Sequence, residues 1–172
     1  FYGYHYFLNK YKNVELKEFT TEQSAIRKLF FRYIEKNLRA ALKLPLYWSF
    51  VVNSSNYQTL KSSNFSIFSS NRIGCSVLHM VIYLKLRKSK ITTLSFVLGL
   101  LSRTPKYKFF IPFQNIYIRI FFMFTDKLIF LSQGEFEFAK QKHSKFIDKF
   151  YYLPFAVDLD VWTIKNQTTE KR

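Results

Sequence analysis

The sequence predicts one α/β domain in which helices cover both faces of a parallel sheet. Three observations support this class. Strand-like and helix-like segments alternate along the chain, and the connections between them are short. The run 91–101 is apolar and β-branched almost throughout, which is typical of a parallel strand buried on both faces. With 172 residues, of which 48% are hydrophobic, the chain can bury a substantial core.

The N-terminal part is expected to contain a strand and a long helix. Alternation over 13–19 predicts the strand, and Thr20 with Gln23 has the capping-box spacing that opens a helix. Apolar residues then recur at three- and four-residue steps until Pro45, which predicts an amphipathic helix with its stripe in the core: Ile26, Leu29, Phe30, Tyr33, Ile34, Leu38, Ala41 and Leu42. The Ser- and Asn-rich segment 53–64 is predicted to be a loop.

The next segments predict a strand, a helix and a second strand. A short strand is expected at 65–69, and the buried strand at 91–101. Between them an apolar stripe predicts a helix that ends in the basic run 87–90, where cations favour a helix C-terminus: Ile73, Val77, Met80, Val81 and Leu84.

The second half repeats the alternation. A helical stripe comes first, made of Phe113, Ile116, Tyr117, Ile120, Phe121 and Phe124. A strand is expected at 127–131, and Ser132 with Glu135 has the spacing of a capping box that opens a helix to about His143. A last strand is expected at 149–153. Joined by right-handed crossovers, these elements predict a Rossmann-like, three-layer domain.

The positive charge is concentrated in the middle of the chain. The formal net charge is +16, and no carboxylate occurs between Glu35 and Asp126, a stretch that holds 13 lysines and arginines. Such a region attracts polyanions, which include phosphorylated substrates, nucleic acid and anionic lipid headgroups. No apolar run reaches the roughly 20 residues that span a bilayer, so membrane contact is expected to be peripheral.

Several chemistries have no candidate residues. The sequence holds no dinucleotide fingerprint, P-loop, metal-ligand cluster or nucleophile elbow. Cys75 is the single cysteine and is expected to be a small buried side chain, and His79 is expected to pack within a helix. No metal and no cofactor are therefore predicted for this chain.

Two segments of the second half carry a resemblance. Asp126-Lys-Leu-Ile-Phe-Leu-Ser132 is followed by a short helix and then by Lys149-Phe-Tyr-Tyr-Leu-Pro-Phe-Ala-Val-Asp-Leu-Asp-Val-Trp162. This order resembles the end of the N-terminal domain of glycosyltransferases of the GT-B fold, family 4-like. Two positions depart from the family pattern, since Phe155 replaces the usual Asn and Ala156 the usual Gly. No His follows the strand at Gly99, where many relatives carry one.

The resemblance implies half of an enzyme. Residues 1–162 would form the acceptor-side domain, with its first strand before Phe1, and 163–172 a linker towards a C-terminal domain that binds the nucleotide-sugar donor. The implied function is transfer of a sugar to a lipid, glycan or phosphorylated acceptor, and this part alone is expected to be inactive. The expected partners are the acceptor, the missing domain and an anionic membrane surface. The expected location is cytoplasmic, with peripheral attachment to the inner face of the membrane.

Candidate site residues lie where the predicted strands end. Ligands of open parallel sheets bind outside the carboxyl ends of the strands. The acceptor or cleft-lining candidates are Gly3, Tyr4, Gly99, Ser102, Arg103, Ser132, Gln133 and Glu135. The interdomain or donor-side candidates are Phe155, Ala156, Val157 and Asp158. Two alternatives stay open: Ser132 could serve only as a helix cap, and Asp158 and Asp160 could be turn residues.

Two other functions compete with the transferase interpretation. Basic residues interleaved with Tyr and Phe are typical of nucleic-acid-binding modules. The aromatic residues are expected to be used in packing, however, so no specific nucleic acid is expected as a partner. A non-catalytic interaction domain is the third possibility, because a fold does not determine a function.

Overall fold

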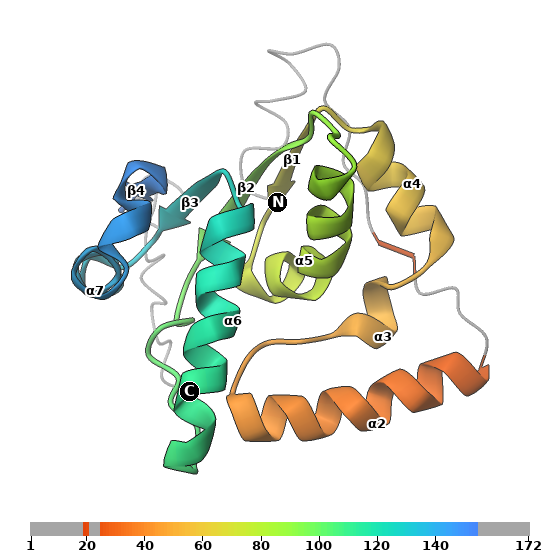
Figure 1. Ribbon diagram of the computed structural model, residues 1–172, viewed down its shortest axis with the longest axis horizontal. Coiled ribbons are helices and arrows are strands. Elements are labelled where there is room, and N and C mark those ends of the chain that lie inside the picture. The colour runs from red at the N-terminus through yellow and green to blue at the C-terminus, as the bar shows by residue number, and fades with distance from the viewer. Residues whose placement is uncertain (1–18, 21–24, 155–172) are drawn as a thin grey trace, which may run out of the picture.

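The computed structural model describes residues 19, 20 and 25–154, and its centre is a four-stranded sheet (Figure 1). The strands are β1 (Phe65–Phe68), β2 (Thr92–Val97), β3 (Lys127–Phe130) and β4 (Phe150–Tyr152). They pair in chain order and all are parallel. The predicted α/β class with a parallel sheet is thereby confirmed, and the arrangement is consistent with a Rossmann-like three-layer fold.

The helices between the strands are those that the apolar periodicity predicts. They are α5 (Asn71–Leu86), α6 (Ile111–Phe124) and α7 (Gln133–Lys142), with the short 3-10 helices η1 (Lys108–Phe110) before α6 and η2 (Ser144–Lys149) after α7. Within the described residues, three helices precede β1, namely α2 (Ala25–Leu42), α3 (Trp48–Val51) and α4 (Ser54–Ser62). None of the described helices is long and apolar enough to cross a membrane.

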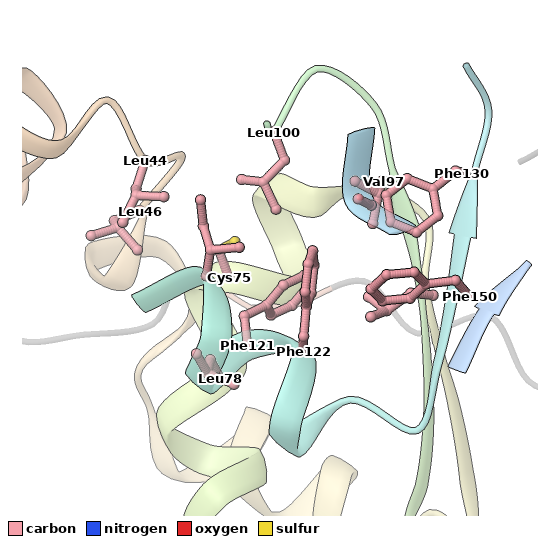
Figure 2. Close-up of a cluster of buried hydrophobic side chains, with 13 residues drawn as sticks. Leu44, Leu46, Cys75, Leu78, Val97, Leu100, Phe121, Phe122, Phe130 and Phe150 are labelled. Carbon is pink, nitrogen blue, oxygen red and sulfur yellow. The ribbon is translucent and has the colours of Figure 1, made fainter. Parts of the chain in front are cut away.

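The core lies between the sheet and helices α5, α6 and α7. Phe122 of α6 is fully buried, and its ring packs edge to face against Phe150, with Phe130 beside both (Figure 2). Gly74 lets α5 approach β2 closely, because a Cβ at this position would lie 2.6 Å from the Ser95 hydroxyl oxygen. A second cluster joins α4, α5 and β1.

Strand β2 is shorter than predicted and is buried on one face only. It ends at Val97, and its residues alternate between buried and half-buried positions. Leu94 and Phe96, on the less buried face, belong to neither core cluster. Residues 98–101 leave the strand, since Gly99 adopts a positive φ of 68°. The apolar run 91–101 therefore combines one strand with the loop that follows it.

Segment 53–64 is mostly helical, so the prediction of a loop was wrong. The side chain of Asn53 accepts a hydrogen bond of 2.7 Å from the amide of Asn56 and thereby caps α4. Leu60 is buried in the second cluster. The polar composition concealed a helix because only one side of α4 faces the core and an asparagine supplies its cap.

The stripe on α2 is only half buried. Leu38 and Leu42 pack against the core, whereas Leu29, Phe30 and Tyr33 are exposed, so the prediction of a core stripe was wrong for its N-terminal half. The C-terminal end of α2 lies beside α6, and the rest of the helix extends away from the sheet (Figure 1). The helix ends at Leu42, followed by Lys43 with a left-handed φ of 54°.

Helix α6 presents a different side to the core than its predicted stripe indicates. The buried residues are Gln114, Ile118, Phe121 and Phe122, whereas Phe113 and Ile116 of the predicted stripe are exposed. Apolar residues surround this helix on every side, so periodicity alone does not choose the buried one.

Some predictions lie outside the described residues. These are the strand at 13–19 apart from Phe19, the capping box of Thr20 and Gln23, and the linker at 163–172. Thr20 itself is described, and its backbone amide donates to the side-chain oxygen of Asn56 over 3.0 Å.

Candidate functional site

A pocket of about 460 Å³ opens at the carboxyl ends of β2 and β3. The loop after β2 forms one wall and the first turns of α7 form the other. This is the edge of a parallel sheet where ligands bind most often. The lining residues are Leu98, Gly99, Leu101, Ser102, Ser132, Gly134, Glu135 and Phe138.

Glu135 joins the two walls of the pocket. Its carboxylate oxygens accept hydrogen bonds from the amides of Gly99 and Leu101, both over 2.7 Å. The predicted capping box is therefore wrong in its contacts, because Glu135 reaches across to the β2 loop and does not return to Ser132. Among the described residues no lysine or arginine pairs with this carboxylate.

Two hydroxyl groups line the same pocket. Ser132 stands at the N-cap position of α7, yet its side chain makes no capping hydrogen bond. The Ser102 hydroxyl contacts the carbonyl of Gly99 over 3.3 Å and is exposed. A serine at an N-cap normally satisfies a free amide of the first helical turn. Because Ser132 does not do so here, its hydroxyl is free to bond a ligand.

Gly99 shapes the loop that carries these groups. Its φ of 68° lies in the left-handed region that side chains with a Cβ adopt only at a cost. A Cβ would have space, since the nearest atom, the Ser102 hydroxyl oxygen, is 3.7 Å away. The glycine is thus required by the backbone turn that directs two amides to Glu135, and not by crowding.

The chemistry of the pocket favours a neutral, hydroxylated ligand. A carboxylate and two hydroxyls can bond sugar hydroxyls, while Leu98, Leu101 and Phe138 offer apolar surface. The Glu135 carboxylate, which pairs with no lysine or arginine of the described part of the chain, repels a phosphate placed in the same space. Among the described residues no group of three or more His, Cys, Asp or Glu could hold a metal ion.

The structure brings together four of the predicted cleft residues. Gly99, Ser102, Ser132 and Glu135 line the pocket, whereas Arg103 and Gln133 are exposed beside it and do not line it. Leu101 and Gly134 lie within the stretches 99–103 and 132–135 that were expected to line this rim, whereas Leu98 and Phe138 were missed. The signal for Leu98 was indirect, since it belongs to an apolar run that resembles a strand. Gly3, Tyr4, Phe155, Ala156, Val157 and Asp158 lie outside the described residues.

Asp126, the first residue of the motif that carries the resemblance, lies at the other end of the sheet and has a structural role there. Its carboxylate accepts from the Thr93 amide over 2.7 Å and from the Thr93 hydroxyl over 2.9 Å, and pairs with Lys85 over 2.6 Å. Burial opposes ionisation, but the hydrogen bonds from Lys85 and Thr93 prevail and lower the pKa of Asp126. These contacts, all made by Oδ2, hold β2, β3 and α5 together at the end of the sheet opposite the pocket.

The described cysteine and histidine side chains lie outside the pocket. Cys75 is buried, as expected, and burial raises the pKa of its thiol. His79 is exposed on α5 and contacts Trp48 edge to face. His143 is buried against Phe122, with neither ring nitrogen hydrogen-bonded. Burial, with Lys142 and Arg119 nearby, lowers the pKa of His143 to about 4.

The comparisons with known proteins add no assignment. No family model, curated protein or solved structure matches this chain significantly. The fold and the pocket define an α/β domain with a polar and apolar pocket at the carboxyl edge of its parallel sheet. Functional conclusions therefore rest on the chemistry of that pocket and on the surface of the domain.

Proposed function

We propose that this chain is the acceptor-binding half of a glycosyltransferase and that the pocket between the β2 loop and α7 binds the sugar that receives the transferred group. The observation that carries the proposal is the combination of Ser102, Ser132 and Glu135 with apolar side chains at this edge of the sheet. The resemblance of segments 126–132 and 149–162 to glycosyltransferases of the GT-B fold points to the same reaction class.

The pocket supports binding and orientation more than chemistry. The Glu135 oxygens accept from two backbone amides, so they can take a further hydrogen bond from a sugar hydroxyl without an ion pair being broken. The Ser132 hydroxyl can donate to or accept from the same ring. A binding role of this kind fits an acceptor site, whose task is to hold a hydroxyl group in line with the donor.

The donor side belongs to the second domain that the resemblance implies. A nucleotide sugar needs basic or amide groups that bind its diphosphate. The charged side chain that lines this pocket is the carboxylate of Glu135, which would repel a diphosphate. The acceptor is accordingly a neutral glycan or the sugar head of a lipid. Transfer then requires the C-terminal domain, and the 172-residue chain is expected to bind the acceptor without turning it over.

Ligand binding can be measured on the chain itself. Saturation-transfer NMR with neutral methyl glycosides should show transfer to the sugar ring protons, and Ser132→Ala should weaken it because the free hydroxyl is lost. Ser144→Ala, at an exposed serine beyond the far end of α7, is the matched control and should leave the transfer unchanged. Glucose 1-phosphate should bind more weakly than methyl glucoside, owing to Glu135.

Two results would contradict the proposal. One is that no neutral glycoside receives saturation from the protein. The other is transfer that Ser132→Ala leaves intact, since the sugar would then bind elsewhere. Activity is tested on the longer protein that the resemblance implies, by following consumption of nucleotide sugars with and without the glycoside that binds best.

A further inference from the structure

An apolar stripe is exposed along η1 and α6. Five side chains form it, each at least half exposed: Tyr107, Phe109, Phe113, Ile116 and Met123. From Phe109 onwards they follow one another at steps of four, three and seven residues, so they lie along one side of the helix. The rings of Phe109 and Phe113 are 5.5 Å apart. We name this set the η1–α6 stripe.

The stripe is too extended to be an ordinary surface feature. At 1.5 Å per residue it runs about 20 Å along the helix. Single exposed apolar side chains are common on proteins, whereas contiguous ones mark a surface that another body covers. Figure 1 shows α6 upright, with its N-terminal end reaching past the sheet to the level of α2.

The segment that carries the stripe has charged side chains of one sign only. Arg103, Lys106, Lys108 and Arg119 are exposed on the same segment, and no acidic residue occurs between Glu35 and Asp126. The Lys106 ammonium lies 5.7 Å from the Tyr107 ring centre, so cation and aromatic side chain adjoin. The body that covers the stripe is therefore expected to be anionic as well as apolar.

We infer that the η1–α6 stripe docks on an anionic lipid bilayer. Helix α6 would lie in the plane of the headgroups, with its apolar side chains inserted at the acyl boundary and the basic residues against the lipid phosphates. Ile116 and Met123 distinguish this partner from single-stranded nucleic acid. They have no ring on which a base can stack, yet they continue the line of Phe109 and Phe113.

Docking in this way would bring the pocket to the membrane. Helix α6 starts at the carboxyl end of the sheet, where the pocket opens, because it returns from the end of β2 to the start of β3. Gln114 of α6 donates a 2.7 Å hydrogen bond to the carbonyl of Arg103 in the pocket's loop. The inference itself does not depend on the transferase proposal, since a vesicle can bind the chain whether or not a sugar does.

Vesicle cosedimentation tests the inference on the 172-residue chain. The probes are phosphatidylcholine vesicles with and without a quarter of phosphatidylglycerol, at low and high salt. Binding is expected only with phosphatidylglycerol and should weaken with salt. The double variant Phe109→Ser and Phe113→Ser should lower the partition coefficient at least about tenfold, because two apolar anchors are lost. Circular dichroism verifies that each variant is folded.

A matched control comes from α2. Leu29→Ser with Phe30→Ser removes similarly exposed apolar surface from another helix and should leave the partition coefficient unchanged. A second pair of variants tests the contribution of charge. Lys106→Ala with Lys108→Ala should lower the partition coefficient about tenfold or more, whereas Lys36→Ala with Lys61→Ala should lower it less. Phe109→Trp reports insertion, since brominated acyl chains should quench the added fluorescence.

Three outcomes would overturn the inference. The first is a chain that does not sediment with either vesicle. The second is an equal loss of binding in the α2 and α6 double variants, which would mean that the stripe has no special role. The third is retention of single-stranded RNA, without retention of vesicles, that the Phe109→Ser and Phe113→Ser variant abolishes; this would assign the stripe to nucleic acid.

Discussion

The two ends of the sheet use the same device with different results. At each end a carboxylate accepts hydrogen bonds from backbone amides of β2 or of the loop that follows it, Asp126 at the amino end and Glu135 at the carboxyl end. Asp126 also binds the Thr93 hydroxyl and Lys85, so the chain itself occupies it. Glu135 has no such cation among the described residues, and hydroxyl groups and a pocket surround it. We call the amino end, with Asp126, the closed end and the carboxyl end, with Glu135, the open end. The closed end contributes to stability, and the open end keeps hydrogen-bonding capacity for a ligand.

Lysines complete the closed end. Lys149 donates from its ammonium group to the carbonyls of Phe122, Met123 and Thr125, which are the last carbonyls of α6 and its continuation. A cation at this position satisfies acceptors that a helix leaves free at its C-terminus. Burial lowers the pKa of Lys149, although Asp126 opposes that shift. At the carboxyl end of the sheet, no described lysine makes an equivalent set of contacts.

The largest effect on stability is expected from Asp126→Ala. The substitution leaves the buried Thr93 amide and hydroxyl and the Lys85 ammonium without their acceptor, which should cost about 2 kcal/mol of the free energy of unfolding. Urea unfolding at pH 7 measures it. Glu137→Ala is the control, because Glu137 pairs with Lys140 at the surface over 3.2 Å and such pairs contribute about 0.5 kcal/mol or less. Equal effects of the two substitutions would refute the closed-end role of Asp126.

A smaller loss is expected from Glu135→Ala, about 1 kcal/mol, because water can reach the amides of the loop once the carboxylate is gone. The more specific readout is hydrogen exchange. The Gly99 and Leu101 amides should exchange faster in Glu135→Ala, with the Thr93 amide unchanged, and Asp126→Ala should show the reverse. A variant that accelerates exchange at both ends alike would mean that the two carboxylates do not act locally.

Gly99→Ala should cost about 1 kcal/mol, since alanine must adopt the left-handed φ of 68°. Gly134→Ala is the matched control, at the start of α7. There the Cβ would meet only the Ser132 hydroxyl oxygen at 4.0 Å, and the gain in helix propensity should stabilise the protein by about 0.5 kcal/mol. Opposite signs for the two glycines are the result to look for in urea unfolding. A loss of similar size at both would point to crowding of the pocket and not to backbone strain.

Sequence patterns were sufficient for most of the elements and for four of the residues that line the pocket, but they did not reveal α4 or the end of β2. The strands at β1, β3 and β4 and the helices α5, α6 and α7 were predicted because their apolar residues are periodic and short connections separate them. Gly99, Ser102, Ser132 and Glu135 could be assigned to one edge because parallel strands end together. The hydrogen-bond partners of Glu135 could not be predicted. A glutamate three residues after Ser132 can accept from the Ser132 amide or from the amides of another loop, and the sequence does not distinguish the two.

The surface was harder to predict than the core for a physical reason. Helix α6 is apolar all round, so nothing local decides whether Phe113 or Phe122 faces the sheet; the position of β3 and β4 decides it. The exposure of the N-terminal half of α2 likewise has no local cause: only the C-terminal half of this helix packs against the core. Aromatic residues that were expected to be used in packing are consequently exposed at Tyr107, Phe109 and Phe113.

The smallest effect at neutral pH is expected at His143, also near the closed end. Its ring is buried on Phe122 with both nitrogens unbonded, and its pKa is lowered to about 4 from the ordinary 6.5. Between pH 6.5 and 4, His143 is protonated in the unfolded chain but remains neutral in the folded chain. The free energy of unfolding must therefore fall as the pH drops from 6.5 to 4. His143→Phe keeps a planar ring and should flatten this part of the unfolding curve while changing stability at pH 7 little.

Asp126 titrates in a separate range, which allows the two groups near the closed end to be told apart. Its pKa is lowered from 3.8, so the stability that it contributes is present above that pH and is lost as the pH falls below it. Asp126→Asn should therefore weaken the dependence below pH 3.8 and retain the loss between 6.5 and 4, and His143→Phe should do the opposite. Thermal unfolding of both variants from pH 7 to pH 3 measures the two ranges. If His143→Phe retains the full loss above pH 4, another group takes up the proton, and the buried ring is not the acid-sensitive element of the fold.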